Sequence, residues 1–254
     1  MQIDFGKTAH DYSRHRAGFP DEFFERLAAW GLGTPGQQVL DLGTGAGTVA
    51  RGLARRGCKV IGLDPAWALL KEAERLDAEA DVVVPRLRAF AETTGLRAQS
   101  FDGVTAGQCW HWFDRARAAQ EARRLLVPQG RLVIAHFDWI PLAGNVVEAT
   151  ERLIEHHNPR WTMGGGAGVY PAWFADVALA GFTAIESFTF DVLVPYTHAA
   201  WRGRIRASAG VAASLASEQV ARFDDELREL LAQHFPQDPL PVPHRVFALV
   251  CQSP

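Results

Sequence analysis

The sequence predicts an α/β fold, with one doubly wound, mostly parallel sheet of seven strands and a helical cap. Short apolar runs alternate with helical patterns through the first half, as expected when crossover helices join parallel strands. A glycine-rich turn, DLGTGAGT (41–48), comes after the first apolar run, at the edge where such sheets bind ligands. With 48% apolar and 22% charged residues, the 254-residue chain can bury a substantial core.

The first half contains five of the expected strands. They lie at 37–43, 59–65, within 81–90, at 101–108 and at 131–137. Three helices are expected between them, at 48–57, 67–80 and 115–130. Gly57 stops the first of these helices, and Pro128 and Gly130 mark the end of the last one.

The second half is less regular. Residues 138–170 hold a helical pattern and a glycine-rich tract, an excursion that is typical of lids and substrate loops. The remaining elements are expected as a helix at 171–182, a strand at 184–196, a helical pattern at 198–235 and a last strand at 244–252. We expect a single domain over 1–254. Its parts are N-terminal cap helices in 1–34, a core at 35–140 and inserts at 141–172 and 198–240.

Composition excludes several classes of partner. A net charge of −3 and a pI near 6.3 give no basic field for nucleic acid. No run approaches the roughly 20 apolar residues of a membrane span, and the N-terminus lacks a signal-peptide core, so we expect a cytoplasmic protein. The odd set Cys58, Cys109 and Cys251 indicates reduced thiols. No metal-ligand signature is present, and we expect a monomer or homodimer with a small-molecule partner.

The glycine turn carries the strongest chemical signal. Gly43, Gly45 and Gly47 permit a tight turn and a close approach of ligand to backbone. The acidic Asp41 leads into the turn, and Asp64 ends the second strand, where a carboxylate can bind both hydroxyls of a ribose. The spacing is GxGxG and no GK[ST] motif is present, which excludes a P-loop. The bland alternative is a strand-to-helix turn without a ligand.

The glycine turn and the second strand together resemble a known family. VLDLGTGAGTVARGLARRGCKVIGLDP (39–65) is similar to the nucleoside-binding core of class I S-adenosylmethionine (SAM) dependent methyltransferases. The resemblance covers residues 1–140 best and implies an antiparallel last strand. It implies that Asp64 holds the ribose of SAM. The other cofactor-binding residues that it implies in this core are Asp41, Gly43, Thr44, Gly45, Gly47 and Pro65, with Ala91 and Glu92 beside the adenine. The family usually has an aspartate where Phe90 stands here.

The stretch GQCWHWFD (107–114) comes after the fourth strand and faces the same edge. It resembles the small-molecule branch that includes trans-aconitate methyltransferase and its fungal relatives, in which His-Trp-Phe is common. We expect Gln108 to bind the amino-acid end of the cofactor, Trp110 and Trp112 the acceptor, and His111 to act as general base. In the alternative interpretation the aromatic rings pack in the core, His111 is a satisfied polar residue and Asp114 starts a helix.

Further candidates lie outside this core. Tyr12 and Arg16, four residues apart, resemble the N-terminal cover of the family, in which such residues reach the carboxylate of SAM; a solvated arginine is the alternative. We expect His136, Tyr170 and Arg204 to bind the acceptor. The glycines at 164–166 would permit a loop to close over it.

The sequence therefore predicts a SAM-dependent methyltransferase that acts on O, N or C of a small organic molecule, mainly by positioning and desolvation. Two alternatives stay open. A SAM-binding protein without methyl transfer would have the same cofactor motifs and an occluded acceptor pocket. An NAD-binding oxidoreductase is less favoured, because Thr48 stands where the dinucleotide pattern GxGxxG has its third glycine.

Overall fold

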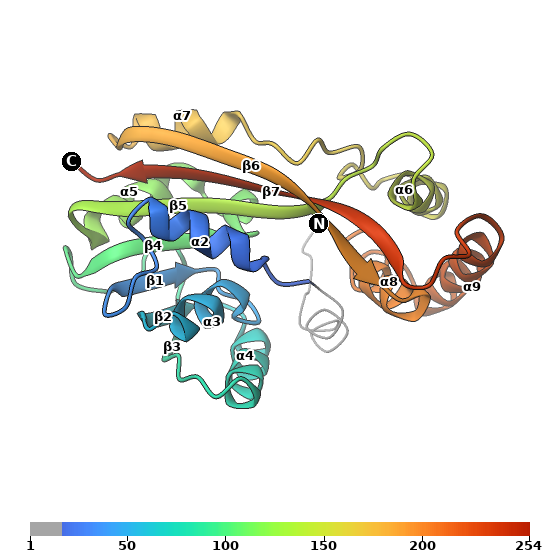
Figure 1. Ribbon diagram of the computed structural model, residues 1–254, viewed down its shortest axis with the longest axis horizontal. Helices are drawn as coiled ribbons and strands as arrows, with labels where there is room; N and C mark the ends of the chain where they lie inside the picture. Colours follow the sequence, from blue (N-terminus) through green and yellow to red (C-terminus); the bar gives the residue numbers. More distant parts are fainter. Residues whose placement is uncertain (1–16) are drawn as a thin grey trace. The chain divides into compact units, whose positions relative to one another are not determined.

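The computed structural model describes residues 17–254, whose strands form a seven-stranded sheet in the order β3-β2-β1-β4-β5-β7-β6 (Figure 1). The strands are β1 (Gln38–Leu42), β2 (Lys59–Leu63), β3 (Arg86–Leu87), β4 (Phe101–Gly107), β5 (Leu126–Trp139), β6 (Thr183–Tyr196) and β7 (Leu240–Gln252). The chain winds outward from β1 to β3 and then returns to β4 on the other side of β1. This reversal confirms the doubly wound fold that was predicted, and it places a switch point between β1 and β4.

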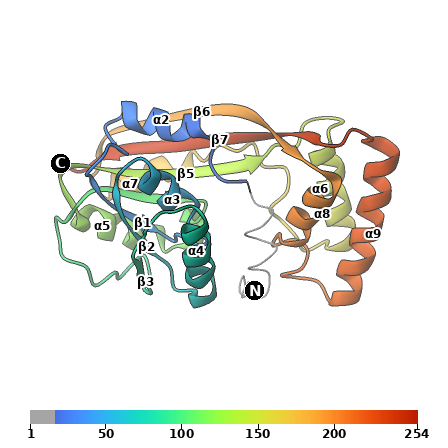
Figure 2. The same cartoon turned by 60° about the horizontal axis from the view of Figure 1, so that its bottom comes forward.

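Most strand pairs are parallel, and the last strand is antiparallel. β1 pairs in parallel with β2 and β4, and β4 pairs in parallel with β5. The backbone N–H of Ser253 donates to Gly130 near the start of β5, whereas that of Ile140 donates to Pro243 after its end. β7 therefore runs against β5, as the opposed arrows show in Figure 2. The antiparallel last strand agrees with the expectation from the resemblance.

Helices cover both faces of the sheet. The helical elements of the described residues are α2 (Asp21–Ala29), α3 (Thr48–Arg55), α4 (Trp67–Glu79), α5 (Arg115–Leu125), α6 (Val146–His157), α7 (Ala172–Leu179), α8 (His198–Arg206), α9 (Ser217–His234) and the 3-10 turn η2 (Trp110–Trp112). On one face α2 crosses in front of the sheet in Figure 1, and its Phe24 ring fills the space beside Gly52 of α3. On the other face Val104 and Ala106 of β4 pack in one buried cluster with residues of α5 and α7.

The chain divides into two compact units. The first, the sheet unit, holds residues 18–137, 170–190 and 246–254. The second, the helical unit, holds the described residues 17, 138–169 and 191–245. The helical unit coincides closely with the inserts predicted at 141–172 and 198–240. Of the segment predicted as an N-terminal cap, α2 belongs to the sheet unit.

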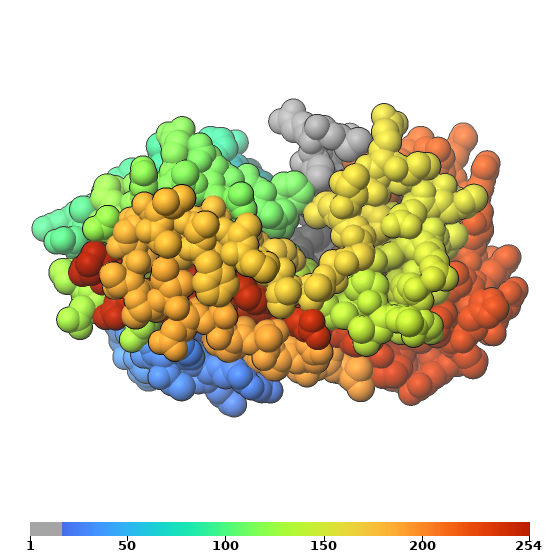
Figure 3. Space-filling view, turned by 90° about the horizontal axis from the view of Figure 1, so that it is seen from above, coloured from blue at the N-terminus to red at the C-terminus, as the bar shows by residue number. Residues whose placement is uncertain are grey.

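Each unit has its own core. In the sheet unit the strands β1, β4 and β5 bury leucines, valines and alanines against α5 and α7. In the helical unit Trp201 of α8 and Phe223 of α9 are fully buried, and the Trp201 indole donates to Thr150 of α6. β6 is the edge strand of the sheet, and the orange surface over β6 and α7 faces the viewer in Figure 3. The two units therefore have separate hydrophobic cores.

Some predicted elements were wrong in their limits, whereas the third strand lies within 81–90 as predicted. The helix expected at 115–130 ends at Leu125, because Leu126 already pairs with Phe101 of β4. Pro128 and Gly130 lie in the irregular first part of β5, where the register with β4 shifts. The third strand is only two residues long. The helical pattern at 198–235 is two helices, α8 and α9, with an interruption at 207–216.

Candidate functional site

The glycine turn joins β1 to α3 in a left-handed backbone conformation. Gly43, Gly45 and Gly47 have φ of 58°, 54° and 80°. A side chain on Gly43 would collide with Cys109, and one on Gly47 would lie 2.9 Å from the Arg86 guanidinium. Among the described residues the space beside Gly45 is open, since the nearest atom there is the Gly43 carbonyl oxygen at 4.0 Å. Gly43 and Gly47 are therefore required by their close neighbours, whereas Gly45 is the one of the three whose backbone is accessible to a ligand.

Asp41 is buried beneath this turn and is only 1% exposed. Its carboxylate accepts hydrogen bonds from the hydroxyls of Thr44 and Thr105, each at 2.7 Å. Burial raises the pKa of Asp41 to about 6, although both threonine hydrogen bonds oppose the rise. Asp41 therefore holds the turn in place from below. The Thr44 hydroxyl is likewise turned inward, and the expectation that Asp41 and Thr44 bind a cofactor stays a prediction.

Asp64 comes directly after β2, at the carboxyl edge next to the glycine turn. One carboxylate oxygen accepts from the backbone N–H of Gly45 at 3.0 Å and the other from Ala66 at 2.8 Å, across Pro65. Burial raises the pKa of Asp64, and the two backbone hydrogen bonds counter the rise. A carboxylate oxygen has a second acceptor position, so Asp64 can still receive hydroxyl hydrogens. The structure thus brings Asp64 and Gly45 together, as the motif spacing suggested.

The predicted adenine side of the site lies after β3. Ala91 is buried in the core of the sheet unit, and Glu92 accepts from the backbone N–H of Asp114 at 2.8 Å. Two large apolar residues are exposed here, Phe90 at 64% and Trp67 at 53%. Phe90 comes after β3 and Trp67 after β2, so both stand at the carboxyl edge of neighbouring strands. Sequence reasoning missed Trp67, although its place three residues after Asp64 could have indicated it.

Gln108 comes directly after β4 in a strained backbone conformation. Its φ is 61°, which is uncommon for a residue other than glycine, and its N–H donates to the Ala135 carbonyl. The side-chain oxygen Oε1 is buried without a hydrogen-bond partner among residues 17–254. A buried acceptor of this kind is costly unless a ligand supplies the donor. Gln108 is therefore a strong candidate for a ligand with an N–H group.

The two indoles of the aromatic stretch have opposite environments. Trp110 is fully buried, and its Nε1 donates to Asp176 of α7 at 3.1 Å. Trp110 therefore packs in the core of the sheet unit, and the expectation that it binds the acceptor stays a prediction without support from its position. Trp112 is 46% exposed and lies beside His111, with ring centroids 4.5 Å apart. Asp114 is the N-cap of α5, and its carboxylate accepts from the backbone N–H of Arg117, as the alternative interpretation had it.

Three polar rings form a chain from the surface into the sheet unit. Nδ1 of His111 lies 3.3 Å from Nε2 of His136, and Nδ1 of His136 lies 3.1 Å from the hydroxyl of Tyr170. His111 is exposed, whereas His136 on β5 is buried. The Tyr170 ring stacks on Trp173 at 4.0 Å, which fixes its orientation. The structure thus joins three residues that the sequence indicated separately.

Arg204, Tyr12 and Arg16 are the remaining predicted site residues. Arg204 belongs to the helical unit, where its guanidinium stands 4.7 Å over the ring of Trp139. Burial lowers the pKa of Arg204, while Tyr196 and Asp138 counter this. Tyr12 and Arg16 fall outside the described residues. In the glycine tract, Gly165 donates its N–H to the buried Glu151 of α6 at 2.8 Å, so this loop is tied to a helix.

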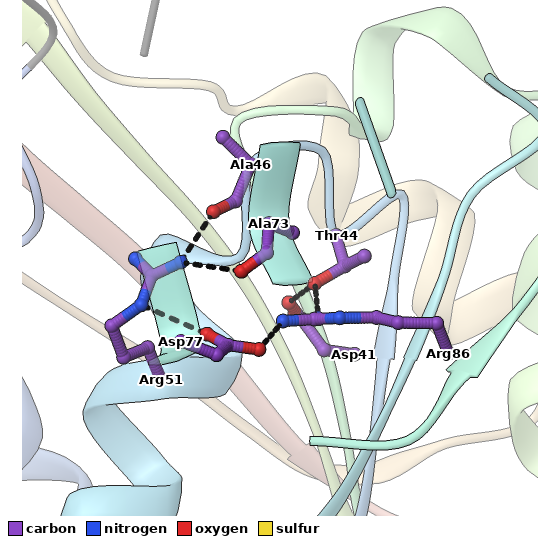
Figure 4. A network of polar contacts seen from close by, with 7 residues as sticks. All are labelled: Asp41, Thr44, Ala46, Arg51, Ala73, Asp77 and Arg86. Carbon is purple, nitrogen blue, oxygen red and sulfur yellow. Dashed lines mark hydrogen bonds and ion pairs between the residues drawn. The ribbon is translucent and has the colours of Figure 1, made fainter. Parts of the chain in front are cut away.

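A buried ionic network lies under the glycine turn, and sequence reasoning missed it (Figure 4). Asp77 of α4 accepts from Arg51 of α3 and forms an ion pair with Arg86 of β3. Arg51 also donates to the carbonyl of Ala46 inside the turn, at 2.7 Å. Burial lowers the pKa of Arg51, and Asp77 counters the effect. A weak signal was present in Gly62, which interrupts the apolar run of β2 where the Arg86 side chain crosses it.

Among residues 17–254 no helix combines the length and the apolar content needed to cross a bilayer. Within the same range, no three His, Cys, Asp or Glu side chains stand close enough to hold a metal ion.

Comparisons with known sequences agree with this geometry. The model of a methyltransferase domain family matches residues 40–134, from β1 to β5. An uncharacterized methyltransferase of Mycobacterium tuberculosis is 33% identical over 153 residues, which are 58% of this chain and 60% of the relative. The chain thus spans about three fifths of the length of that curated relative.

Solved structures show the same fold. The YcgJ protein of Bacillus subtilis has a TM-score of 0.57 at 19% identity, over 92% of this chain and 97% of that one. Phosphoethanolamine N-methyltransferase 2 of Haemonchus contortus has a TM-score of 0.59 at 20% identity, over 99% of this chain and 60% of that one. The latter was solved with phosphomonomethylethanolamine and S-adenosylhomocysteine, and in another crystal with SAM.

Proposed function

Because residues 40–134 belong to the methyltransferase domain family, within a class I SAM methyltransferase fold, we propose that this protein transfers a methyl group from SAM to a small organic acceptor. The acceptor atom is O, N or C. The observation that carries the proposal is the buried, unpaired Oε1 of Gln108 at the switch point of the sheet, within the described residues 17–254. It stands at the carboxyl edge that also holds the open face of Gly45 and the carboxylate of Asp64.

The donor groups of SAM suit these residues. Its ammonium group would give Gln108 Oε1 the hydrogen bond that no residue in 17–254 supplies. Its ribose hydroxyls would donate to Asp64, whose oxygens each accept one backbone N–H already. The exposed rings of Phe90 and Trp67 offer apolar faces for the adenine. The open face of Gly45 leaves room for the cofactor between these groups.

The same turn argues against the dinucleotide alternative. Gly47 ends the turn as the N-cap of α3, and Thr48 opens the helix in place of a third glycine. A pyrophosphate needs bare backbone at a helix N-terminus, and here the Gly47 backbone packs against the guanidinium groups of Arg86 and Arg51. This supports a nucleoside without a pyrophosphate, in line with the SAM complexes of the Haemonchus enzyme.

Bound SAM supplies an electrophilic methyl group on a sulfonium. The protein then has to hold the acceptor in line with that group and to receive a proton where the acceptor is a hydroxyl or an amine. His111 is the candidate general base, because its imidazole is exposed, lies close to Gln108 in sequence and is oriented by His136. The exposed face of Trp112 next to it provides a wall for the acceptor.

One arrangement of the ring chain supports Nε2 of His111 as the basic nitrogen. When His111 donates from Nδ1 to His136, and His136 donates from its own Nδ1 to Tyr170, Nε2 of His111 is left as an acceptor. A proton taken up at Nε2 then leaves a His111 imidazolium that keeps its Nδ1 hydrogen bond to His136. His136 and Tyr170 act here as positioning residues, through the orientation and tautomer of His111.

A labelling screen tests the proposal. The protein is incubated with trideuteromethyl SAM and a metabolite extract, and products are sought by mass spectrometry. We expect at least one small molecule to gain a trideuteromethyl group in place of hydrogen, and the Asp64→Ala variant to form none. Labelling that is absent across broad extracts, while SAM still binds, would favour a SAM-binding protein without methyl transfer.

A further inference from the structure

The side chain of Arg86 takes an unusual path through the sheet unit. Arg86 starts on the edge strand β3 and crosses the neighbouring strand β2 at Gly62, where any side chain would collide with its guanidinium. Its two terminal nitrogens then reach Asp77 of α4 and the hydroxyl of Thr44, the latter at 3.5 Å. Its Nε is buried without a hydrogen-bond partner among the described residues. A buried N–H without a hydrogen-bond partner destabilises the folded protein, so the contacts of the two terminal nitrogens of Arg86 must offset this loss.

Asp77 lies between two arginines and is 4% exposed. It accepts from Nε of Arg51 at 2.9 Å and pairs with Arg86 through its other oxygen. The Nη2 atom of Arg51 donates to the Ala46 carbonyl of the glycine turn at 2.7 Å. The side chains of Arg51 and Arg86 are 13% and 10% exposed, so water screens this network little. Removing one member would leave a buried charge without its partner.

The network touches the glycine turn at three points. Arg86 reaches the Thr44 hydroxyl, which in turn donates to Asp41. Arg51 holds the carbonyl of Ala46. Both guanidinium groups pack against Gly47, at 2.9 Å and 3.1 Å from where a side chain would begin. Contacts at Thr44, Ala46 and Gly47 therefore hold the turn, and Figure 4 shows those at Thr44 and Ala46.

We propose that Arg86 and Asp77 are positioning residues for the cofactor, which hold the glycine turn in its binding conformation through Thr44 and Ala46. The inference rests on the proposed function, since it assigns the turn to SAM. The backbone N–H of Gly45 can donate to the Asp64 carboxylate only while the turn keeps this conformation. The turn therefore determines the position of the carboxylate that would bind the ribose. Holding a site in its bound conformation before the ligand arrives lowers the cost of binding.

The first experiment reads the turn without any cofactor. Backbone hydrogen exchange is followed by mass spectrometry in Arg86→Met, Arg86→Lys and Asp77→Asn, with Arg75→Met as matched control. Arg75 lies on the same helix as Asp77, but its ion pairs with Glu72 and Glu79 are at the surface. We expect faster exchange in peptides that cover 43–48 for Arg86→Met and Asp77→Asn, and an unchanged rate for Arg75→Met. Arg86→Lys keeps the positive charge but loses the two-pronged guanidinium, so its exchange rate should lie between those of the wild type and Arg86→Met.

The second experiment measures SAM affinity by calorimetry for the same variants. Losing a charge-assisted hydrogen bond that shapes the site should weaken SAM binding about tenfold in Arg86→Met. Arg75→Met should bind within about twofold of the wild type, as surface pairs contribute little. Thr44→Ala in the Arg86→Met background should add little further loss, because both changes act on one path.

The outcomes separate the inference from the function on which it rests. Normal exchange at 43–48 together with wild-type SAM affinity in Arg86→Met and Asp77→Asn would overturn the inference. Lower unfolding midpoints or uniform changes in exchange, with SAM affinity kept, would assign the network to global stability and would also overturn it. If the wild-type protein itself fails to bind SAM, the proposed function fails, while the exchange data still report on whether Arg86 holds the turn. Should Arg86→Met not fold, the lysine and asparagine variants carry the test.

Discussion

His136 and His111 lie with Nε2 of the one 3.3 Å from Nδ1 of the other, and the Tyr170 hydroxyl continues the line at 3.1 Å from His136. His136 is buried and lies between the exposed imidazole of His111 and the phenol of Tyr170. Its contribution is to fix the orientation and tautomer of the exposed ring, in the way that a carboxylate does in a catalytic triad. If methyl transfer needs a base, removal of the His111 ring should lower turnover and leave SAM binding unchanged.

We predict that His111→Ala keeps SAM affinity and loses turnover by about 10²- to 10⁴-fold, the range for removal of a general base. The measurement is single-turnover methyl transfer to the acceptor that the labelling screen identifies, with calorimetry for SAM on the same variant. Tyr170→Phe should lower turnover less, because it removes only the far end of the chain. Unchanged turnover in His111→Ala would refute the role as base.

Trp110 and Trp112, two residues apart, should respond oppositely to truncation. Trp110→Ala empties a fully buried site and leaves Asp176 without its indole donor, so it should cost about 3–5 kcal/mol of unfolding free energy. Trp112 is half exposed, and Trp112→Ala should cost less than about 1 kcal/mol while it weakens acceptor binding. Urea unfolding and the KM for the acceptor measure the two effects. Equal losses of stability would contradict the assignment of Trp110 to the core.

Asp41 should give a pH dependence of stability with a definite sign. Its pKa in the folded protein is about 6, above the ordinary 3.8, so its contribution to stability is complete below 3.8 and is lost as pH rises through about 6. Asp41→Asn removes this titration. The unfolding free energy of the variant minus that of the wild type should therefore rise by up to about 3 kcal/mol between about pH 4 and pH 7 and then level off. Parallel stability curves for the two proteins would show that Asp41 is not the group that titrates.

In the helical unit, Glu151 should anchor the glycine tract. Its carboxylate accepts from Gly165 and from the indole of Trp139, each at 2.8 Å, and it is 6% exposed. Glu151→Ala should cost about 1–3 kcal/mol, since two donors lose a buried acceptor, and should speed proteolysis within 162–168. Arg152→Ala, on the exposed side of the same helix, is the control. A digestion rate that is unchanged in Glu151→Ala would mean that other contacts hold the tract.

Local spacing was enough to predict the glycine turn, Asp64 and the seven strands, because each depends on residues close in sequence. The network of Arg86 and Asp77 was not predictable in this way. It depends on a side chain that crosses a neighbouring strand at Gly62, and only the register of β2 with β3 reveals that crossing. The start of β5 was missed for a similar reason, since pairing of Leu126 with Phe101 outweighs the local helical pattern.

The choice between the two indoles shows the same limit. Trp110 and Trp112 both lie in the short turn η2, and neither periodicity nor composition tells which ring faces the core. The partner that decides it is Asp176, which is 66 positions away in sequence. The role of Trp112 and His111 toward an acceptor stays a prediction, as does the resemblance to the trans-aconitate branch.

Calorimetric titration with SAM and with NAD distinguishes a methyltransferase cofactor site from a dinucleotide site. We expect saturable binding of SAM in one-to-one stoichiometry and no binding of NAD, because Gly45, Asp64 and Gln108 together offer groups for a ribose and an amino-acid end but none for a pyrophosphate. Asp64→Ala should abolish the SAM signal, while Arg75→Met should leave it unchanged. Tight binding of NAD without binding of SAM would contradict the assignment of this turn to SAM.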